Sequence, residues 1–225
     1  MSNTIENYNK HYQNIDSEIF PQEWIVRIFM GKYPKINLQD NLKGKKILEV
    51  SCGDGRNFAP LIKKEMKISA TEITHQIVEN LSKAFPNIEF KQALNLSLPF
   101  DENSFDYLLS WNQIYYMGSN KEDLNFTKYV EEFSRVIKSG GNMIVSVPMA
   151  DSFIFNSSTK IDNKYRMICN DPFGTRDGEI MRCFKDEQDI IEEFSKYFDN
   201  FTFASSINDH FGIQNNWHIF ICQKI

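Results

Sequence analysis

The chain has 225 residues, of which 41% are apolar and 24% charged, the balance of a folded domain rather than a disordered chain. At about 150 residues per domain, this length favours one large domain over two. Thirty acidic residues against 25 basic ones give a net charge of −5, which disfavours nucleic acid and anionic membranes as partners.

The first 44 residues predict a helical N-terminal cap. Pro21 suits the first turn of a helix. The apolar face of this helix would be formed by Trp24, Ile25, Ile28 and Phe29. The polar start of the chain lacks the apolar core of a signal peptide.

From residue 45 onward, short β-branched runs alternate with segments of helical period, which predicts a parallel α/β sheet. The five strands predicted there are residues 45–50, 68–72, 88–92, 105–110 and 142–147. Thr74 is the predicted N-cap of the helix after the second strand. Asn120 is the predicted N-cap of the helix after the fourth, with Lys138 in its last turn and Gly140-Gly141 ending it. The buried stripe of that helix would be Phe126, Tyr129, Val130, Phe133, Val136 and Ile137.

The last third of the chain follows another pattern. Residues 149–184 show no sustained period and predict an excursion from the sheet, after which a helix starts near Asp186. Strands at 201–206 and 217–223 are too close for a helical crossover and should pair antiparallel. We therefore expect a Rossmann-like α/β fold with a seven-stranded, mostly parallel sheet, the last strand antiparallel and helices on both faces. The single domain would comprise a cap (1–44), a cofactor-binding half (45–148), a substrate-side insertion (149–184) and a C-terminal helix and strand pair (185–225).

The four cysteines, Cys52, Cys169, Cys183 and Cys222, are scattered and form no CxxC pair. No stretch approaches the roughly 18 apolar residues of a membrane helix. We therefore expect a cytoplasmic protein with neither a metal site nor a disulfide framework.

A glycine-bearing turn follows the first predicted strand, in the segment ILEVSCGDGRN of residues 47–57. Gly53 and Gly55 permit positive φ and a close approach of the backbone to a ligand, although any strand-to-helix turn can use glycine. The third glycine of a dinucleotide fingerprint is replaced by Phe58, and the Gly-Lys-Ser/Thr of a P-loop is absent. The turn thus favours a nucleotide-type ligand without phosphates.

Glu72 ends the second predicted strand, next to that turn. A carboxylate there can accept two hydrogen bonds from a ribose diol. The simpler alternative is a solvated acid near the start of a helix.

Four segments together resemble successive motifs of the class I S-adenosylmethionine-dependent methyltransferases. They are ILEVSCGDGRN, TEIT, LSLPFDENSFDYLLSWNQIYYM and FSRVIKSGGNMIVSVP, within about residues 45–148. By this resemblance S-adenosylmethionine is the cofactor, and the turn residues Ser51, Cys52, Gly53 and Gly55 would lie under its methionine part, supported by Glu49. Glu72 would hold the ribose and Ile73 would flank the adenine. Trp111 and Asn112 would lie beside the methionine moiety and the transferring methyl.

The sequence departs from the family pattern at two places. Ser51 stands where the family commonly has glycine. After the third strand, Leu94 and Asn95 stand where many members present an acid to the adenine amino group, so Asn95 or the backbone would make that contact.

Further candidates surround the expected cofactor site. Arg27 could reach the cofactor carboxylate as a fork, or could instead lie over Trp24 at the surface. Tyr8 and Tyr12 could cover the cofactor. Tyr115 and Tyr116 could form aromatic walls for a sulfonium, or pack as ordinary core residues.

His210 is the best candidate for a general base, because it lies between the last two strands, on a connection expected at the same sheet edge as the glycine turn. A solvent-facing loop histidine is the alternative, and Tyr115 or Tyr116 would then be the next candidates.

These observations together predict a methyltransferase for a small polar acceptor, with oxygen as the nucleophile and a sugar or phosphorylated metabolite as the substrate. The aromatic and basic residues of the insertion that suit such an acceptor are Phe153, Phe155, Tyr165, Arg166, Arg176 and Arg182. No Asn-Pro-Pro-aromatic motif of base methylases follows the fourth strand. Two rival functions remain open: a non-catalytic relative acting as an assembly partner, and an NAD-dependent oxidoreductase.

Overall fold

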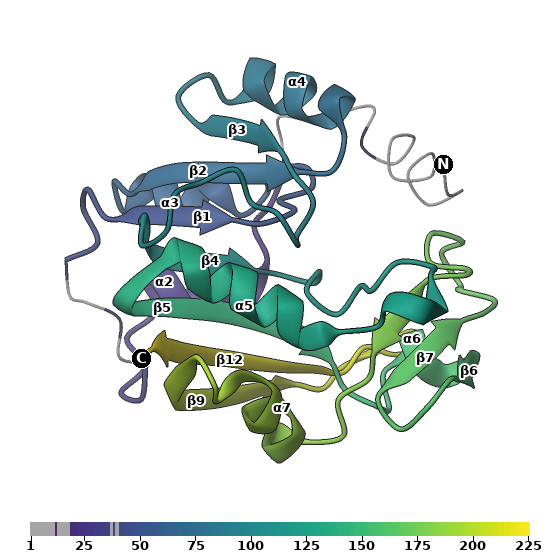
Figure 1. The fold of residues 1–225 in the computed structure, drawn as a ribbon. Coiled ribbons are helices and arrows are strands. Elements are labelled where there is room, and N and C mark those ends of the chain that lie inside the picture. The colour runs from purple at the N-terminus through teal and green to yellow at the C-terminus, as the bar shows by residue number, and fades with distance from the viewer. Residues whose placement is uncertain (1–11, 13–18, 37, 39–40) are drawn as a thin grey trace.

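The computed structural model describes residues 12, 19–36, 38 and 41–225. Its centre is a seven-stranded sheet with the order β3-β2-β1-β4-β5-β12-β9 (Figure 1). β12 is antiparallel to both of its neighbours, whereas the other neighbouring strands are parallel. This confirms the predicted sheet of six parallel strands with a reversed last strand. The strands are β1 (Lys46–Glu49), β2 (Lys67–Glu72), β3 (Glu89–Gln92), β4 (Phe105–Ser110), β5 (Ile137–Pro148), β9 (Phe198–Ser206) and β12 (Trp217–Lys224).

The winding of the sheet reverses at β1. Ile47 of β1 pairs with Ile68 of β2 on one side and with Tyr107 of β4 on the other. In an open α/β sheet, ligands bind beyond the carboxyl ends of the strands at such a reversal. The fold therefore puts the glycine turn, which follows β1, at the expected binding edge.

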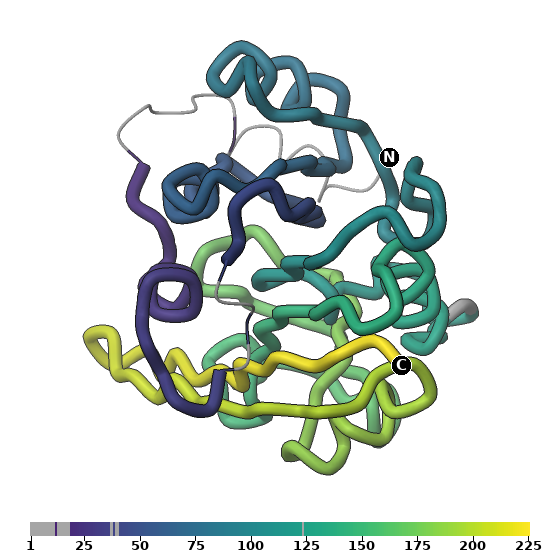
Figure 2. Tube along the Cα trace, turned by 90° about the vertical axis from the view of Figure 1, so that its left-hand side faces the viewer, coloured from purple at the N-terminus to yellow at the C-terminus, as the bar shows by residue number. Residues whose placement is uncertain are grey.

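Helices cover both faces of the sheet (Figures 1 and 2). Each face has its own apolar core. One core joins α2, α3 and α4 to the sheet through residues such as Ile25, Phe58 and Leu81. The other joins α5 and α7 to the opposite face through residues such as Phe133 and Phe194. The helices are α2 (Glu23–Met30), α3 (Phe58–Lys63), α4 (His75–Ala84), α5 (Phe126–Val136), α6 (Phe153–Asn156) and α7 (Glu187–Phe194).

The start and the end of the helix that follows the fourth strand were predicted wrongly. Asn120 caps a short 3₁₀ helix, η1 (Lys121–Asp123), while α5 begins at Phe126 after Asn125. α5 ends at Val136, and Gly140-Gly141 lie inside β5, where the pairing with β4 is irregular. A Cβ on Gly141 would come within 2.8 Å of the Asp106 carbonyl oxygen, so this glycine permits the close approach of two strands.

Residues 149–184 leave the main sheet as predicted, but they contain regular structure that the sequence did not reveal. They form α6 and a small antiparallel sheet with the order β6-β7-β8. A separate hairpin of two short strands, β10 and β11, lies between β9 and β12 in the chain. These strands are β6 (Ser158–Lys160), β7 (Tyr165–Ile168), β8 (Ile180–Arg182), β10 (Asp209–His210) and β11 (Ile213–Gln214).

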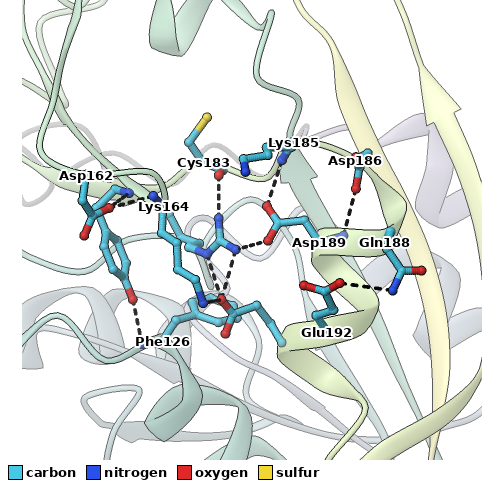
Figure 3. A network of polar contacts seen from close by, with 12 residues as sticks. Phe126, Asp162, Lys164, Cys183, Lys185, Asp186, Gln188, Asp189 and Glu192 are labelled. Atoms are coloured by element: carbon cyan, nitrogen blue, oxygen red, sulfur yellow. Dashed lines mark hydrogen bonds and ion pairs between the residues drawn. The ribbon is translucent and has the colours of Figure 1, made fainter.

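A buried ionic network fixes this insertion to the main body (Figure 3). Arg182 of β8 has a fully buried side chain that pairs with Asp189 and, at 3.0 Å, with Glu193, both on α7. Lys164, in the turn between β6 and β7, pairs with the same Glu193 at 2.6 Å. In addition, the Tyr165 hydroxyl accepts a hydrogen bond from the backbone N–H of Phe126 at the start of α5. Arg182 therefore holds the insertion in place and does not face a binding cavity.

Among the described residues, no helix has the length and apolar character needed to cross a bilayer.

Candidate functional site

A cleft of about 810 Å³ opens at the carboxyl ends of β1, β2 and β4, between the glycine turn and the insertion. Its lining includes residues of the turn and of the ends of β2 and β4, together with Phe173, Thr175, Arg176 and Glu179 of the insertion. A second groove of about 830 Å³ is lined by Lys46, Lys67 and Phe105 among others, and all of its charged side chains are at least partly exposed. Only the first cleft contains buried titratable groups, so it is the candidate site.

The turn after β1 has three residues with positive φ: Ser51 (53°), Gly53 (62°) and Gly55 (77°). Ser51 thus adopts the left-handed conformation despite its Cβ, at a cost of order 1–2 kcal/mol, at the position where the family commonly has glycine. A Cβ on Gly53 would lie 2.9 Å from the Tyr12 hydroxyl at the cleft. Cys52, between Ser51 and Gly53 in the chain, is buried and also lines the cleft.

Gly55 has a different role from the one predicted. It does not line the cleft. A Cβ there would come within 2.6 Å of the Phe58 ring and 2.9 Å of the Phe85 ring. Gly55 therefore lets α3 pack through Phe58, the residue that replaces the third glycine of a dinucleotide fingerprint.

Glu49 is a buried carboxylate with one unused oxygen. Its Oε1 accepts a hydrogen bond from Asn57 Nδ2 at 2.8 Å, whereas its buried Oε2 has no partner among the described residues. Burial raises the pKa of Glu49 to about 8. An unpartnered buried carboxylate oxygen is costly, so this atom is suited to receive a donor from a ligand.

Glu72 joins the end of β2 to the glycine turn. Its Oε1 accepts from the Gly53 N–H at 2.7 Å and its Oε2 from the Ile73 N–H at 2.9 Å. Burial raises the pKa of Glu72 to about 7, although both backbone hydrogen bonds lower it. Each carboxylate oxygen can accept a second hydrogen bond, so Glu72 can still hold a diol. Ile73 lines the cleft beside it.

A chain of side-chain hydrogen bonds connects the ends of three strands under the cleft. Ser51 Oγ donates to Asn95 Oδ1 at 3.3 Å, Asn95 Nδ2 to Gln113 Oε1 at 2.6 Å, and Gln113 Nε2 to Ser110 Oγ at 2.6 Å. Gln113 is buried and lines the cleft. Gln113 was not among the predicted site residues, because a lone glutamine after a strand carries no spacing signal.

Trp111 and Asn112, after β4, both line the cleft. Asn112 has φ of 57°, and its backbone N–H and its Oδ1 both bond the Ser146 hydroxyl of β5. This contact fixes the turn that carries Trp111.

Tyr115 and Tyr116 form an aromatic wall with ring centroids 4.9 Å apart. Tyr115 is fully buried, and burial raises its pKa well above the ordinary value. The Tyr116 hydroxyl accepts a hydrogen bond from Arg176 Nε at 3.1 Å. Trp217 at the start of β12 extends the wall, with its ring centroid 6.0 Å from that of Tyr115.

Two of the predicted site residues, Arg27 and His210, lie away from the cleft. Arg27 does not line the cleft; it is exposed, pairs with Glu23, bonds the Tyr33 hydroxyl at 2.7 Å and lies over the Trp24 ring. The surface alternative for Arg27 is thus the one the structure shows.

His210 lies in the exposed β10–β11 hairpin, where its Nδ1 faces Asn215 Nδ2 at 3.4 Å, and it does not line the cleft. It is therefore not placed to act as a base there. Of the two N-terminal tyrosines, Tyr12 lines the cleft, and its pKa is raised by burial and by the charge of Glu72. Tyr8 lies outside the described residues.

Within the insertion, Arg176 is the only one of the six predicted acceptor residues that lines the cleft. The other residues of the insertion that line the cleft, Phe173, Thr175 and Glu179, were not predicted. The irregular loop that carries them has no periodicity from which the direction of their side chains could be inferred.

Comparison with known proteins identifies relatives of this chain. A family described as "Methyltransferase domain" matches residues 47–141. An uncharacterised protein of Methanocaldococcus jannaschii is 31% identical over 193 residues, which cover 85% of this chain and 72% of that protein. The demethylmenaquinone methyltransferase of Chlorobaculum tepidum is 31% identical over 105 residues, 46% of this chain and 41% of that enzyme. The chain thus spans less than half of this named relative.

Solved structures show the same fold at low identity. A methyltransferase from Methanosarcina mazei superposes with a TM-score of 0.65 at 18% identity, covering 86% of this chain and 98% of that one. The Burkholderia thailandensis 1,6-didemethyltoxoflavin-N1-methyltransferase, with its substrate and S-adenosylhomocysteine bound, gives 0.63 at 12% identity, covering 99% and 85%. With the domain match and the archaeal relative, the sheet order and the glycine turn identify the chain as a member of the class I S-adenosylmethionine-dependent methyltransferases.

Proposed function

We propose that this methyltransferase acts on the oxygen of a small polar acceptor bound between the tyrosine wall and the insertion. The observation that carries the proposal is the division of the cleft: one half has two buried carboxylates at a glycine turn, and the other has an aromatic wall and an arginine. The first half suits a cationic nucleoside ligand and the second a polar substrate.

The cofactor half fits S-adenosylmethionine residue by residue. The unpartnered Oε2 of Glu49 suits the methionine ammonium, and Glu72 suits the ribose diol. Ile73 and Asn95 would flank the adenine. The remaining contacts would come from Ser51, Cys52, Gly53, Trp111 and Asn112, all of which line the cleft.

When bound, S-adenosylmethionine supplies a methyl group on a positively charged sulfur, which is already electrophilic. The protein then has to align the acceptor oxygen with that methyl, exclude water and receive a proton. Tyr115 and Tyr116 provide an aromatic wall of the kind that suits a sulfonium. We assign Tyr116, whose hydroxyl is oriented by Arg176, to relay the acceptor proton: its oxygen accepts that proton while its own hydroxyl proton passes to water, since His210 lies elsewhere.

The acceptor class we propose is a sugar or a phosphorylated metabolite. Related enzymes act on unlike molecules, as the names demethylmenaquinone methyltransferase and 1,6-didemethyltoxoflavin-N1-methyltransferase show. The net charge of −5 supports a small acceptor over a nucleic acid. We further propose a cytoplasmic location, which the four free cysteines support.

Calorimetry with S-adenosylhomocysteine tests the cofactor half. Glu72→Ala should weaken binding at least about tenfold, because each hydrogen bond to a charged acceptor is worth roughly 1.5–3 kcal/mol. Glu79→Ala removes an exposed acid from α4 and serves as the matched control. Unchanged affinity in Glu72→Ala, or tighter binding of NAD than of S-adenosylhomocysteine by the wild type, would contradict the assignment.

Release of S-adenosylhomocysteine from S-adenosylmethionine, measured with a panel of sugars and sugar phosphates, tests the transfer itself. We expect turnover with at least one acceptor and a strong decrease in Tyr116→Phe, with cofactor affinity retained. Tight cofactor binding without any turnover would instead favour the non-catalytic relative.

A further inference from the structure

Part of the lining of the cleft comes from the loop of residues 169–179, which joins β7 to β8. Asp171 organises this loop, and its side chain is fully buried. One of its carboxylate oxygens accepts from the backbone N–H of Thr175 at 2.9 Å and from the Thr175 hydroxyl at 3.2 Å. The Asp171 N–H in turn donates to Asp177 Oδ1 at 2.7 Å. The loop is therefore set by its own hydrogen bonds before any acceptor binds.

The guanidinium of Arg176 is held from several sides. Nη1 pairs with both oxygens of Asp171 at 2.9 and 3.2 Å, and Nε donates to Tyr116. Its Cζ lies 5.7 Å from the ring centroid of Phe153 and 5.9 Å from that of Phe173. The side chain is only 19% exposed and lines the cleft.

The third nitrogen of this guanidinium, Nη2, makes no hydrogen bond or ion pair with any described residue. A planar guanidinium fixed by two of its nitrogens can offer the third to an oxyanion with little further loss of entropy. A rigid arginine with one unused donor, facing the acceptor half of a cleft, is the arrangement expected of a recognition residue.

The charges around the cleft limit what this donor can bind. Arg56, the other arginine of the cleft, is ion-paired with Asp54 beside the glycine turn. Asp171 offsets part of the charge of Arg176, and the buried Glu179 lines the same wall. This balance admits one anionic group close to Nη2 and disfavours an acceptor that carries several.

We propose that Arg176 is a specificity-determining residue that binds a single oxyanion, a carboxylate or a phosphate, on the methyl acceptor. The inference rests on the proposed function for the role of the cleft, but the subsite itself can be tested by binding alone. Asp171 positions Arg176, and the aromatic rings of Phe153 and Phe173 hold the plane of its guanidinium.

The test uses the full chain saturated with S-adenosylhomocysteine and two small probes. Inorganic phosphate is followed by the width of its phosphorus resonance, and acetate by saturation transfer from the protein. The variants are Arg176→Gln, Arg176→Lys and, as the matched control, Lys160→Gln, which removes an exposed cation from β6 of the same insertion.

We expect the wild type and Lys160→Gln to bind at least one probe, and Arg176→Gln to bind it at least about tenfold more weakly. Arg176→Lys retains the charge but not the planar fork, and should lie between them. If Arg176→Gln fails to fold, the comparison of probe binding between Arg176→Lys and the wild type tests the proposal instead. Binding of phosphate alone identifies a phosphorylated acceptor, and binding of acetate alone identifies a carboxylic acid.

Absence of binding for both probes in the wild type, or equal binding by the wild type and the folded Arg176 variants, would overturn the proposal. Calorimetry on the same samples keeps the two hypotheses apart. Loss of probe binding with intact S-adenosylhomocysteine binding refutes only the oxyanion subsite. If the wild type fails to bind S-adenosylhomocysteine, the proposed function fails, and the same probes titrated into the ligand-free protein still decide on Arg176.

Discussion

Glu49→Gln should make the stability of the ligand-free protein less sensitive to pH. Burial raises the pKa of Glu49 from 4.5 to about 8, so the folded protein keeps a proton that the unfolded chain has already lost over this range. At about 1.4 kcal/mol per pH unit, the free energy of unfolding should decrease by up to about 5 kcal/mol as the pH rises from 4.5 to 8. The contribution is complete below pH 4.5 and is lost by pH 8, because unfolding in this window releases a proton.

Urea denaturation of the ligand-free protein at pH 5, 7 and 8.5 measures this effect. The wild type should lose stability through both Glu49 and Glu72, whose pKa is raised to about 7, whereas Glu49→Gln should retain only the Glu72 part. The amide adds a buried donor where Oε2 has no partner, which costs roughly 1–3 kcal/mol at every pH. The slopes with pH, rather than the absolute stabilities, are therefore compared, with Glu79→Gln as the surface control.

The same carboxylate should link cofactor binding to a proton. If the ammonium of the ligand binds Glu49, the ionised form is favoured in the complex, and binding at pH 7 should release about one proton from a group with a pKa of about 8. Calorimetry of S-adenosylhomocysteine in buffers of different ionisation enthalpy counts that proton, and Glu49→Gln should lose it. Identical pH slopes and identical proton release in the two proteins would refute the reasoning.

Four other substitutions test the fold and the site. Gly53→Val, at φ of 62° on the cleft wall, should abolish S-adenosylhomocysteine binding in calorimetry, whereas Gly55→Ala should lower the melting temperature through its contact with Phe58 and leave the wall intact. Arg182→Met should cost about 3–5 kcal/mol in urea denaturation, because it removes the cation of Asp189 and leaves the buried Glu193 with Lys164 alone; a loss below 1 kcal/mol would contradict this. His210→Ala should leave the methyl-transfer rate within about twofold of the wild type, and a hundredfold decrease would restore it as the base.

The central sheet could be predicted because its signals are local and repeat along the chain. The central parallel strands β1, β2 and β4 are short and mostly buried runs, and the crossover helices carry a clear apolar face, as Leu81 and Phe133 show. The positions of Gly53 and Glu72 followed from the rule that strand ends meet at one edge of the sheet. Their side-chain and backbone contacts, such as the Gly53 N–H bonded to Glu72, are consistent with that reasoning.

What could not be predicted depends on the direction of individual side chains, which the periodicity of the sequence does not encode. The position of Arg27 in the sequence is compatible with a contact to the cofactor carboxylate or with a surface site. Only the structure shows that its partners are Glu23 and Tyr33. His210 follows the long strand β9, but it lies in the short β10–β11 hairpin, where it is exposed to solvent. The direction of Arg176 depends on Asp171, a carboxylate five residues earlier in a loop without periodicity.

The two halves of the cleft are stabilised by different means, and this difference bears on what each half recognises. The cofactor half is built from backbone at the end of β1 and from buried carboxylates such as Glu72, so its geometry is a property of the sheet itself. The other part of the lining combines the tyrosine wall after β4 with the loop that carries Arg176, and this loop belongs to an insertion attached to α7 through Arg182. Changes in the loop can therefore alter this part of the cleft without moving Glu49 or the glycine turn. This separation explains why the residues of the cofactor site resemble a large family, whereas the acceptor has to be inferred from the charges and donors of a single loop.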